Sequence, residues 1–370
     1  MIGRQVRTAT ALVITAGALV ASLSVAPADA ATRHRPPPAN CAPAATAVGF
    51  SDALDKLVVD GQEIGGLSNL AWDRHTHSYA STVDNNDTDP SRVWFIRDLS
   101  DPEPVGDPLI LRRPDGTPYT GETADNEGMA VLPDGRFVVS SEVEPSIRIF
   151  SRSGVQQESL PVPARFAVQP AGEATANATL EGLTISRSGR TIIASMEGTL
   201  SGDTGDGNFR RLLIYTRTHH GYRLDRQLAY RVDDGMRIPE IAEYAPGKLL
   251  IMEAAWSADV GNTVTLYAAD ISRAADVSDV PDLATTPDLV VGKQLVADVT
   301  QCPDLGATAK ETQINPLMDN YEAMAVRPAI GPGIFGGHGH RGSYQVTLLS
   351  DDNFNDTQTT RVLDLVARLP

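Results

Sequence analysis

The sequence predicts an all-β fold: a single β-propeller of five or six four-stranded blades, closed by an N-terminal strand. Three observations lead to this prediction. A unit of apolar strand, turn and second apolar strand recurs along the 370 residues. Turn residues such as Asp134-Gly135 and Ser188-Gly189 separate the two strands of a unit. Further apolar runs lie between the units, and about four strands per unit is the composition of a propeller blade.

Most copies of the unit begin with an acidic residue. The two clearest copies start at Glu127-Gly-Met-Ala-Val and at Glu181-Gly-Leu-Thr-Ile. Looser copies start at Glu240 and Glu322, and a degenerate first copy spans 66–84. Five units are therefore countable.

The ends of the repeat array decide how the ring closes. Residues 46–59 can supply outer strands to the last blade, and residues 270–299 leave room for a degenerate sixth blade. A β-sandwich or a parallel β-solenoid is the alternative architecture. Sandwiches do not repeat internally, however, and solenoid rungs are shorter than these units.

The repeat also predicts a site. In a blade the first strand runs along the channel and the second returns, so the start of one and the end of the other share a face. Acidic residues occupy both positions, which predicts a carboxylate ring at one mouth of the channel. Asp351 and Asp352 are alternatives at the end of the last unit. The expected metal ligands are Asp84, Glu127, Glu142, Glu181, Glu197, Glu240, Glu253, Glu322 and Asp352.

Three of these residues, Glu127, Glu181 and Glu322, open their copies in the same register and are the candidate catalytic residues. For any single glutamate, capping a backbone amide or pairing with arginine explains its presence equally well. The hypothesis of a site therefore rests on the set.

Crowded carboxylates repel one another unless protons or cations neutralise them. Calcium binds six to eight hard oxygen ligands and is the expected cofactor. Arg92, Arg97 and Arg237 are the candidate residues for attracting an anionic, small-molecule ester substrate. The formal charge of −16 argues against nucleic acid as a partner, because nucleic-acid binding needs a basic footprint.

The N-terminus predicts export. Residues 1–30 have a positive start, an apolar stretch and a small-residue cleavage site ending at Ala30, as in a secretory signal peptide. Residues 31–45 are expected to form a disordered linker and 46–370 the propeller domain. No second apolar segment is long enough to span a membrane, so we expect a secreted, extracellular protein. We also expect it to be a monomer.

The chain has two cysteines, Cys41 and Cys302. In an oxidising compartment we expect them to form a disulfide, which would tie the N-terminal arm to the loop before the last copy. They are too few and too far apart for a zinc site.

Several enzyme motifs are absent from the sequence. It contains no Gly-x-Ser-x-Gly, no phosphate-binding Walker loop and no dinucleotide glycine motif. His338 and His340 lie two residues apart in a Gly-rich segment, where a surface loop is the favoured explanation over a metal or acid–base pair.

Five segments together resemble the "esterase-like activity of phytase" family of secreted bacterial propellers. They are Asn126-Glu-Gly-Met-Ala-Val, Leu180-Glu-Gly-Leu-Thr-Ile, Tyr321-Glu-Ala-Met-Ala, Leu348-Leu-Ser-Asp-Asp-Asn-Phe and Gln358-Thr-Thr-Arg. The resemblance covers roughly residues 50–368. It implies a hydrolase related in architecture to calcium-dependent propeller phytases. One departure is that Glu253 is followed by Ala254, where such proteins often carry arginine.

The hypothesis that follows is a secreted, calcium-dependent phosphoester or ester hydrolase that uses an acidic propeller mouth. A lactonase of the gluconolactonase type is one alternative, because such a propeller also uses a divalent cation and an early glutamate. A non-catalytic propeller that binds a ligand or an envelope partner is the other.

Overall fold

The structure is a computed structural model that describes residues 39–84, 87–329 and 342–370. The expected signal peptide, most of the expected linker and the two histidines of the Gly-rich segment lie outside the described residues. The chain divides into Met1–Pro37 and Pro38–Pro370, and all that follows concerns the second unit.

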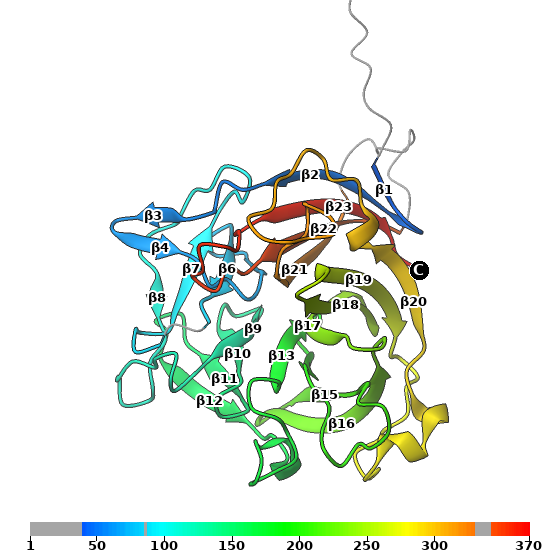
Figure 1. Ribbon diagram of the computed structural model, residues 1–370. Coiled ribbons are helices and arrows are strands. Elements are labelled where there is room, and N and C mark those ends of the chain that lie inside the picture. The colour runs from blue at the N-terminus through cyan, green and yellow to red at the C-terminus, as the bar shows by residue number, and fades with distance from the viewer. Residues whose placement is uncertain (1–38, 85–86, 330–341) are drawn as a thin grey trace, which may run out of the picture. The chain divides into compact units, whose positions relative to one another are not determined.

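The second unit is a five-bladed β-propeller, as the repeat predicts (Figure 1). The inner strands β9, β13, β17 and β21 pack side by side around the channel, and β5 packs against β9. Blade one consists of β5 (Ala71–Asp73), β6 (Ser78–Thr82), β7 (Arg92–Ile96) and β8 (Leu109–Ile110). Blade two consists of β9 (Asn126–Val131), β10 (Phe137–Ser141), β11 (Ser146–Phe150) and β12 (Gln156–Leu160).

Blades three and four are also four-stranded and antiparallel. Blade three consists of β13 (Leu180–Ile185), β14 (Thr191–Met196), β15 (Phe209–Thr218) and β16 (Gly221–Arg231). Blade four consists of β17 (Arg237–Ala245), β18 (Lys248–Ser257), β19 (Gly261–Asp270) and β20 (Lys293–Asp298). The segment considered for a sixth blade instead supplies β20 and two short 3-10 helices, η2 (Leu283–Thr285) and η3 (Pro287–Leu289).

The N-terminal arm closes blade five, as expected. This sheet contains β21 (Tyr321–Pro328), β22 (Ser343–Ser350), β23 (Val362–Arg368), β2 (Ala45–Ser51) and β1 (Ala39–Cys41) from the channel outward. β1 therefore lies inside residues 31–45, the segment expected to be a linker. It forms there because it pairs with β2 and carries Cys41, which forms the expected disulfide with Cys302.

The remaining elements lie between blades. A hairpin of β3 (Leu57–Val59) and β4 (Gln62–Ile64) precedes blade one. Two further 3-10 turns are η1 (Ala164–Phe166) and η4 (Val299–Gln301).

The core lies between adjacent blades, where apolar side chains from facing sheets pack together. Val138 and Ile149 of blade two, for example, share a buried cluster with Leu183 and Leu213 of blade three. Alternation along each strand sends one set of side chains to each neighbouring blade, so nearly every strand position is buried. This packing holds the inner strands at fixed positions around the channel.

Two glycines show how closely the inner strands approach one another. A methyl group on Gly128 would lie 2.3 Å from the carbonyl oxygen of Glu181. A methyl group on Gly182 would lie 2.9 Å from the amide nitrogen of Ile241. The glycine after the glutamate in each clear copy therefore lets the next inner strand pack against it.

Candidate functional site

The glutamates that open the copies sit in β-bulges of the inner strands. In blade two, Glu127 and Gly128 together oppose the single residue Ser140, and in blade three Glu181 and Gly182 oppose Ser195. Glu322 likewise occupies a register shift between β21 and β22. A bulge re-aims a side chain out of the regular alternation.

Hydrogen bonds between neighbouring strands fix the bulged backbone. The Ser140 hydroxyl donates to the carbonyl oxygen of Glu181 at 3.0 Å, and the amide of Gly128 donates to that hydroxyl at 2.8 Å. The Asn69 amide donates to the carbonyl oxygen of Glu127. Backbone geometry at the candidate catalytic glutamates is therefore set by polar residues of adjacent strands, which the core packing in turn holds in place.

The second acidic set comes from the ends of the returning strands. Glu142 and Glu197 follow β10 and β14, Asp84 follows β6, and Asp351 follows β22. As the antiparallel hairpins require, these ends lie on the face where the inner strands begin. We call this end of the channel the mouth, lined by Asp84, Glu127, Glu142, Asn177, Glu181, Glu197, Arg237, Asn320, Glu322 and Asn353.

The mouth is a cavity of about 250 Å³ with an almost entirely polar lining. Six carboxylates and one guanidinium line it, so its formal charge is −5 when every carboxylate is ionised. Such a density of like charge is unstable unless protons or cations neutralise it.

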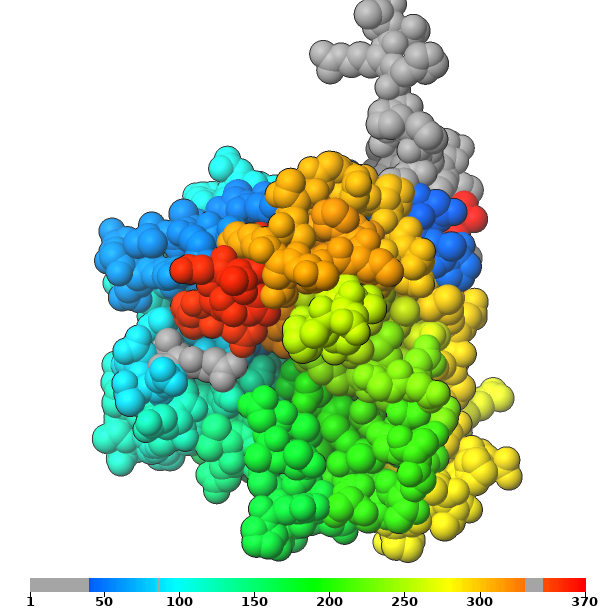
Figure 2. All heavy atoms as spheres, in the orientation of Figure 1, coloured from blue at the N-terminus to red at the C-terminus, as the bar shows by residue number. Residues whose placement is uncertain are grey.

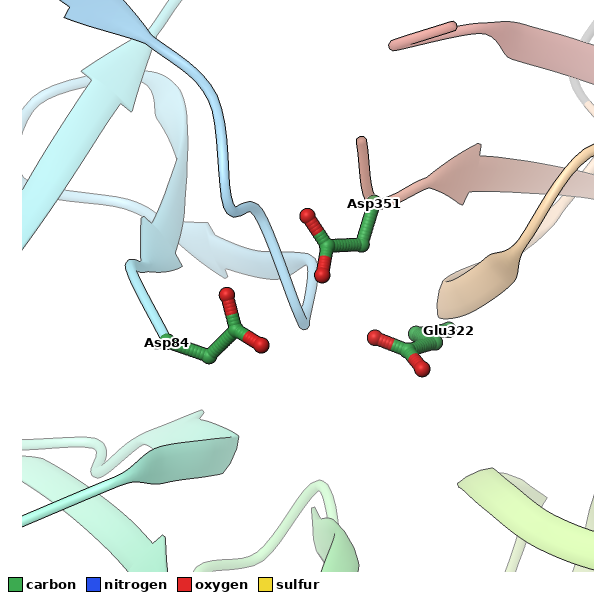
Figure 3. A group of neighbouring side chains, drawn as sticks. All are labelled: Asp84, Glu322 and Asp351. Atoms are coloured by element: carbon green, nitrogen blue, oxygen red, sulfur yellow. The ribbon is translucent and has the colours of Figure 1, made fainter. Parts of the chain in front are cut away.

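The carboxylates form three overlapping groups whose oxygen atoms lie within 4.8 Å of one another. These groups are Asp84, Glu322 and Asp351; Asp84, Asp125 and Glu127; and Glu127, Glu142 and Glu181. Figure 3 shows the first group, in which the three side chains from separate segments converge on a common space. Asp351 is fully buried, and its Oδ2 atom accepts no hydrogen bond from the described residues. A buried carboxylate oxygen in that state is costly unless a ligand or a proton meets it.

Burial raises the pKa of these acids, and the neighbouring carboxylates raise it further. The pKa values of Glu127, Glu181, Asp84 and Asp351 all lie well above those of exposed carboxyls, first because of desolvation and then because of the surrounding negative charge. Burial and the charge of Glu197 raise the pKa of Glu142 to about 8. The backbone amide of Thr179, which donates to this carboxylate, acts in the opposite direction and lowers the pKa. Without a cation, Glu142 is therefore mostly protonated at neutral pH, and the other carboxyls take up protons more readily than exposed ones.

Arg237 is the cation that the fold itself places in the mouth. Its guanidinium donates to Glu322 at 2.8 Å, to Glu197 at 3.1 Å and to Glu181 at 3.3 Å. It also donates to the Asn320 side-chain oxygen at 3.0 Å. Burial alone would lower the pKa of Arg237, because it disfavours the charged guanidinium. The three carboxylates stabilise that charge more strongly, so the pKa is raised.

Glu127 differs from its neighbours in its bonding. Its carboxylate is buried in the mouth, yet no described residue donates a hydrogen bond to it. Its oxygens therefore remain available to an external partner. Glu181, by contrast, already accepts from Arg237.

Glu240 and Glu253 do not line the mouth. In blade four the bulged pair is Ile238 and Pro239, which oppose Glu253, so both glutamates lie two residues away from the positions that reach the mouth. Glu240 instead accepts from the amides of Leu183 at 3.0 Å and Ile241 at 2.8 Å.

Glu253 is enclosed by donors away from the mouth. The Tyr230 hydroxyl and the Lys293 ammonium each lie 2.6 Å from its Oε1, and the Asp233 amide lies 2.8 Å from its Oε2. Both blade-four glutamates therefore have structural partners that account for them.

Asp352 also lies apart from the mouth. It accepts from the Gly66 amide at 3.0 Å and from Lys56 at 2.7 Å, whereas the adjacent Asp351 belongs to the carboxylate group. Of the two residues that the sequence left open, Asp351 is the one in the cluster.

Among the three arginines expected to attract a substrate, only Arg237 reaches the mouth. Arg92 starts β7 and lines a separate cavity beside the β3–β4 hairpin, 3.9 Å from Asp89. Arg97 follows the other end of β7, where Ile96 pairs with Tyr79, and forms an exposed ion pair with Glu103. Arg97 therefore lies at the end of its blade that is away from the mouth.

Sequence reasoning missed Asp125 and the three mouth asparagines, Asn177, Asn320 and Asn353. Asp125 lies two residues before Glu127, which opens the second copy, so an acid next to a copy boundary was an available signal. The asparagines lie in loops between strands, where the repeat gives no register.

A closed five-bladed propeller with a buried polyanionic mouth and one inserted arginine is thus the class that fold and site define. The chain belongs to the family described as "Phytase-like: Esterase-like activity of phytase", which matches residues 62–354. Membership of this family supports a propeller hydrolase or a related enzyme.

Solved propellers are similar to this chain only at the level of the fold. A GH43 β-1,3-galactosidase with galactodeoxynojirimycin has 11% identity and a TM-score of 0.44, covering 83% of this chain and 91% of its own. The periplasmic gluconolactonase of Pseudomonas aeruginosa has 10% identity and a TM-score of 0.36, covering 83% and 87%. The PQQ-bound aldose sugar dehydrogenase of Streptomyces coelicolor has 12% identity and a TM-score of 0.38, covering 81% and 79%. At these scores they support no functional argument.

No curated protein sequence matches the chain. Among the residues that the structure describes, no helix has the length and apolar character needed to cross a membrane.

Proposed function

We propose that the chain is an exported, calcium-dependent phosphoester hydrolase whose active site is the propeller mouth. The observation that carries this proposal is the run of overlapping carboxylate groups in a cavity with a formal charge of −5. Only cations or protons can neutralise such a cavity, and an anionic substrate can enter only after neutralisation. The disulfide of Cys41 with Cys302 fits an oxidising compartment and hence export.

The donor set fits calcium. Carboxylate and amide oxygens are hard ligands, and calcium accepts six to eight of them in flexible geometry. Asp84 and Glu127 each belong to two carboxylate groups and would bridge neighbouring positions, and the open Oδ2 of Asp351 offers one further ligand atom. Calcium bound there would supply positive charge that polarises a phosphoryl oxygen and offsets charge in the transition state.

The protein's own groups would then bind the substrate and move a proton. Arg237 is shared by three carboxylates, so neutralisation of Glu181 and Glu322 would leave its planar guanidinium free to bind phosphoryl oxygens. Once ionised, Glu127 can accept a proton from the attacking water through a carboxylate oxygen that calcium leaves unoccupied. In this hydrolysis the water oxygen forms a bond to phosphorus, the ester P–O bond breaks, and the leaving oxygen takes up a proton from solvent.

Phosphate release by the purified mature chain tests the proposal. We expect release from phytate or a simple phosphomonoester in millimolar calcium, and loss of both calcium binding and turnover in the double variant Glu127→Gln, Glu181→Gln. Arg97→Gln, on the opposite face, is the matched control and should keep full activity. Full activity in the double variant would refute the proposal. Opening of a sugar lactone without phosphate release would point to a lactonase, and ligand binding without turnover to a binding propeller.

A further inference from the structure

A second cavity lies next to the mouth and has a different character. It has a volume of about 510 Å³ and shares Glu197 and Arg237 with the mouth, so these two residues form the wall between the cavities. Its lining comes from the ends of β14, β15, β17 and β18 and the loops that join them. The segment where β18 ends, yellow-green in Figure 2, lies in full view on the face that carries the mouth.

One side of this cavity is apolar and includes an exposed tryptophan. Trp256 is the penultimate residue of β18 and is 62% exposed, whereas Trp94 in the core is 2% exposed. Met236, Ala254 and Ala255 line the same cavity. A large aromatic ring left in water beside small apolar residues is the usual lining of a site that binds another ring.

The other side of the cavity contains a buried arginine that forms no ion pair with any acid of the described residues. Arg210 is 7% exposed and donates only to backbone carbonyls, those of Gly207 at 2.7 Å, Phe209 at 3.0 Å and Met236 at 2.8 Å. Its Nε atom is buried without a hydrogen-bond partner among the described residues. Burial lowers the pKa of Arg210 to about 10, and the negative charges of Glu197 and Glu253 offset this lowering only in part.

The two acids that line the cavity form ion pairs with other arginines, so neither of them pairs with Arg210. Glu197 is paired with Arg237 at 3.1 Å, and Asp206 is paired with Arg231. The cavity lining holds two acids and two arginines, so it is formally neutral, unlike the mouth. A buried guanidinium that binds only carbonyls gains most from an anionic oxygen.

We propose that this cavity is a binding subsite for a flat, ring-bearing carboxylate, with the ring against Trp256 and the anionic oxygen toward Arg210. Binding at the subsite requires neither calcium nor catalysis. The link from this subsite to a substrate does rest on the proposed function. A longer ligand that reaches from the subsite past Glu197 and Arg237 would place an ester group in the mouth. The substrate class would then be a phosphoester that also carries a ring-bearing carboxylate, so that the carboxylate stays free to bind Arg210.

Benzoate binding to the calcium-free chain tests the subsite alone, because the mouth then lacks the cations that are proposed to admit an anionic substrate. We expect benzoate to bind more tightly than acetate, which lacks the ring, and more tightly than benzamide, which lacks the charge. Calorimetry with these three probes needs no variant of Arg210, whose replacement could disturb the loops it anchors. Equal affinity for benzoate and either comparison compound would overturn the proposal.

Variants of the exposed tryptophan test the ring contact. Loss of one aromatic stacking partner corresponds to roughly a three- to tenfold weaker affinity, which we expect for Trp256→Ala. Trp256→Phe should keep most of the affinity, and Val58→Ala, an exposed apolar residue of β3, should leave it unchanged. Unchanged benzoate affinity in Trp256→Ala would refute the subsite even if calcium-dependent phosphate release were found. Failure of phosphate release would leave the benzoate result standing.

Discussion

Removal of the Arg237 charge should destabilise the calcium-free protein far more than removal of the Arg97 charge. Arg237→Gln keeps a polar side chain of moderate length but deletes the guanidinium that donates to Glu181, Glu197 and Glu322. The three carboxylates are mostly buried, so the change leaves negative charge in a cavity that lacks another basic residue in its lining.

The magnitude follows from this burial. Removing one partner of a buried ion pair costs about 3–5 kcal/mol, whereas an exposed pair is worth about 0–1 kcal/mol. Protonation of the carboxylates limits the cost. Burial raises the pKa values of Glu181 and Glu197, so both take up protons more readily as the pH falls, and the arginine then has less charge to compensate. The loss in unfolding free energy should therefore be largest near pH 8 and small near pH 5.

Urea unfolding at the two pH values, without calcium, measures this difference. Arg97→Gln provides the matched control, because Arg97 forms an exposed pair with Glu103. The control should change the unfolding free energy by about 1 kcal/mol or less at either pH. A loss below about 1 kcal/mol for Arg237→Gln at pH 8, or the same loss at both pH values, would refute the reasoning.

Three further predictions concern protons, Glu253 and the disulfide. Because the pKa of Glu142 rises to about 8, the calcium-free native state binds more protons than the unfolded chain. Its unfolding free energy should therefore fall as the pH rises from 4.5 to 8, and a rising profile in urea titrations would contradict this. Glu253→Gln should cost about 3–5 kcal/mol through its buried bonds to Tyr230 and Lys293 but leave the calcium affinity measured by calorimetry unchanged. Replacing both Cys41 and Cys302 by serine should cost about 2–5 kcal/mol in thermal unfolding, and an unchanged melting temperature would contradict it.

The repeat predicted the parts of the site that follow from strand register. Glu127 and Glu181 could be found because two long, well-matched copies share the same acid, glycine and turn. Their returning strands also place Glu142 and Glu197 at equivalent positions, each two residues after the serine that opposes the bulge. Local pattern and blade geometry agree at these positions, so sequence alone located them.

Blade four shows where that reasoning fails. Its sequence contains no Glu-Gly pair, and Glu240 was the nearest acid to the expected position. In the structure the bulge falls at Ile238 and Pro239, and Arg237 reaches the mouth directly opposite Ala254. A two-residue shift of this kind depends on pairing between strands, which the composition of a single segment does not specify.

The choice between Asp351 and Asp352 failed for a related reason. Adjacent residues at a strand end face different directions, so one carboxylate points to the mouth and the other to Gly66 and Lys56. Arg210 and Trp256 had no repeat signal at all, since their environment is built from loops of two blades.

Calcium-dependent thermal unfolding of the wild-type chain and of the Glu127→Gln, Glu181→Gln variant tests the central claim most directly, namely that the mouth binds divalent cations. For a ligand at a hundredfold excess over its Kd, the native state gains about 2.7 kcal/mol, or roughly 5 °C in melting temperature for a chain of this size. The account predicts such a rise in the wild type and its loss in the variant. An unchanged melting temperature in wild type, or an equal rise in both proteins, would contradict it.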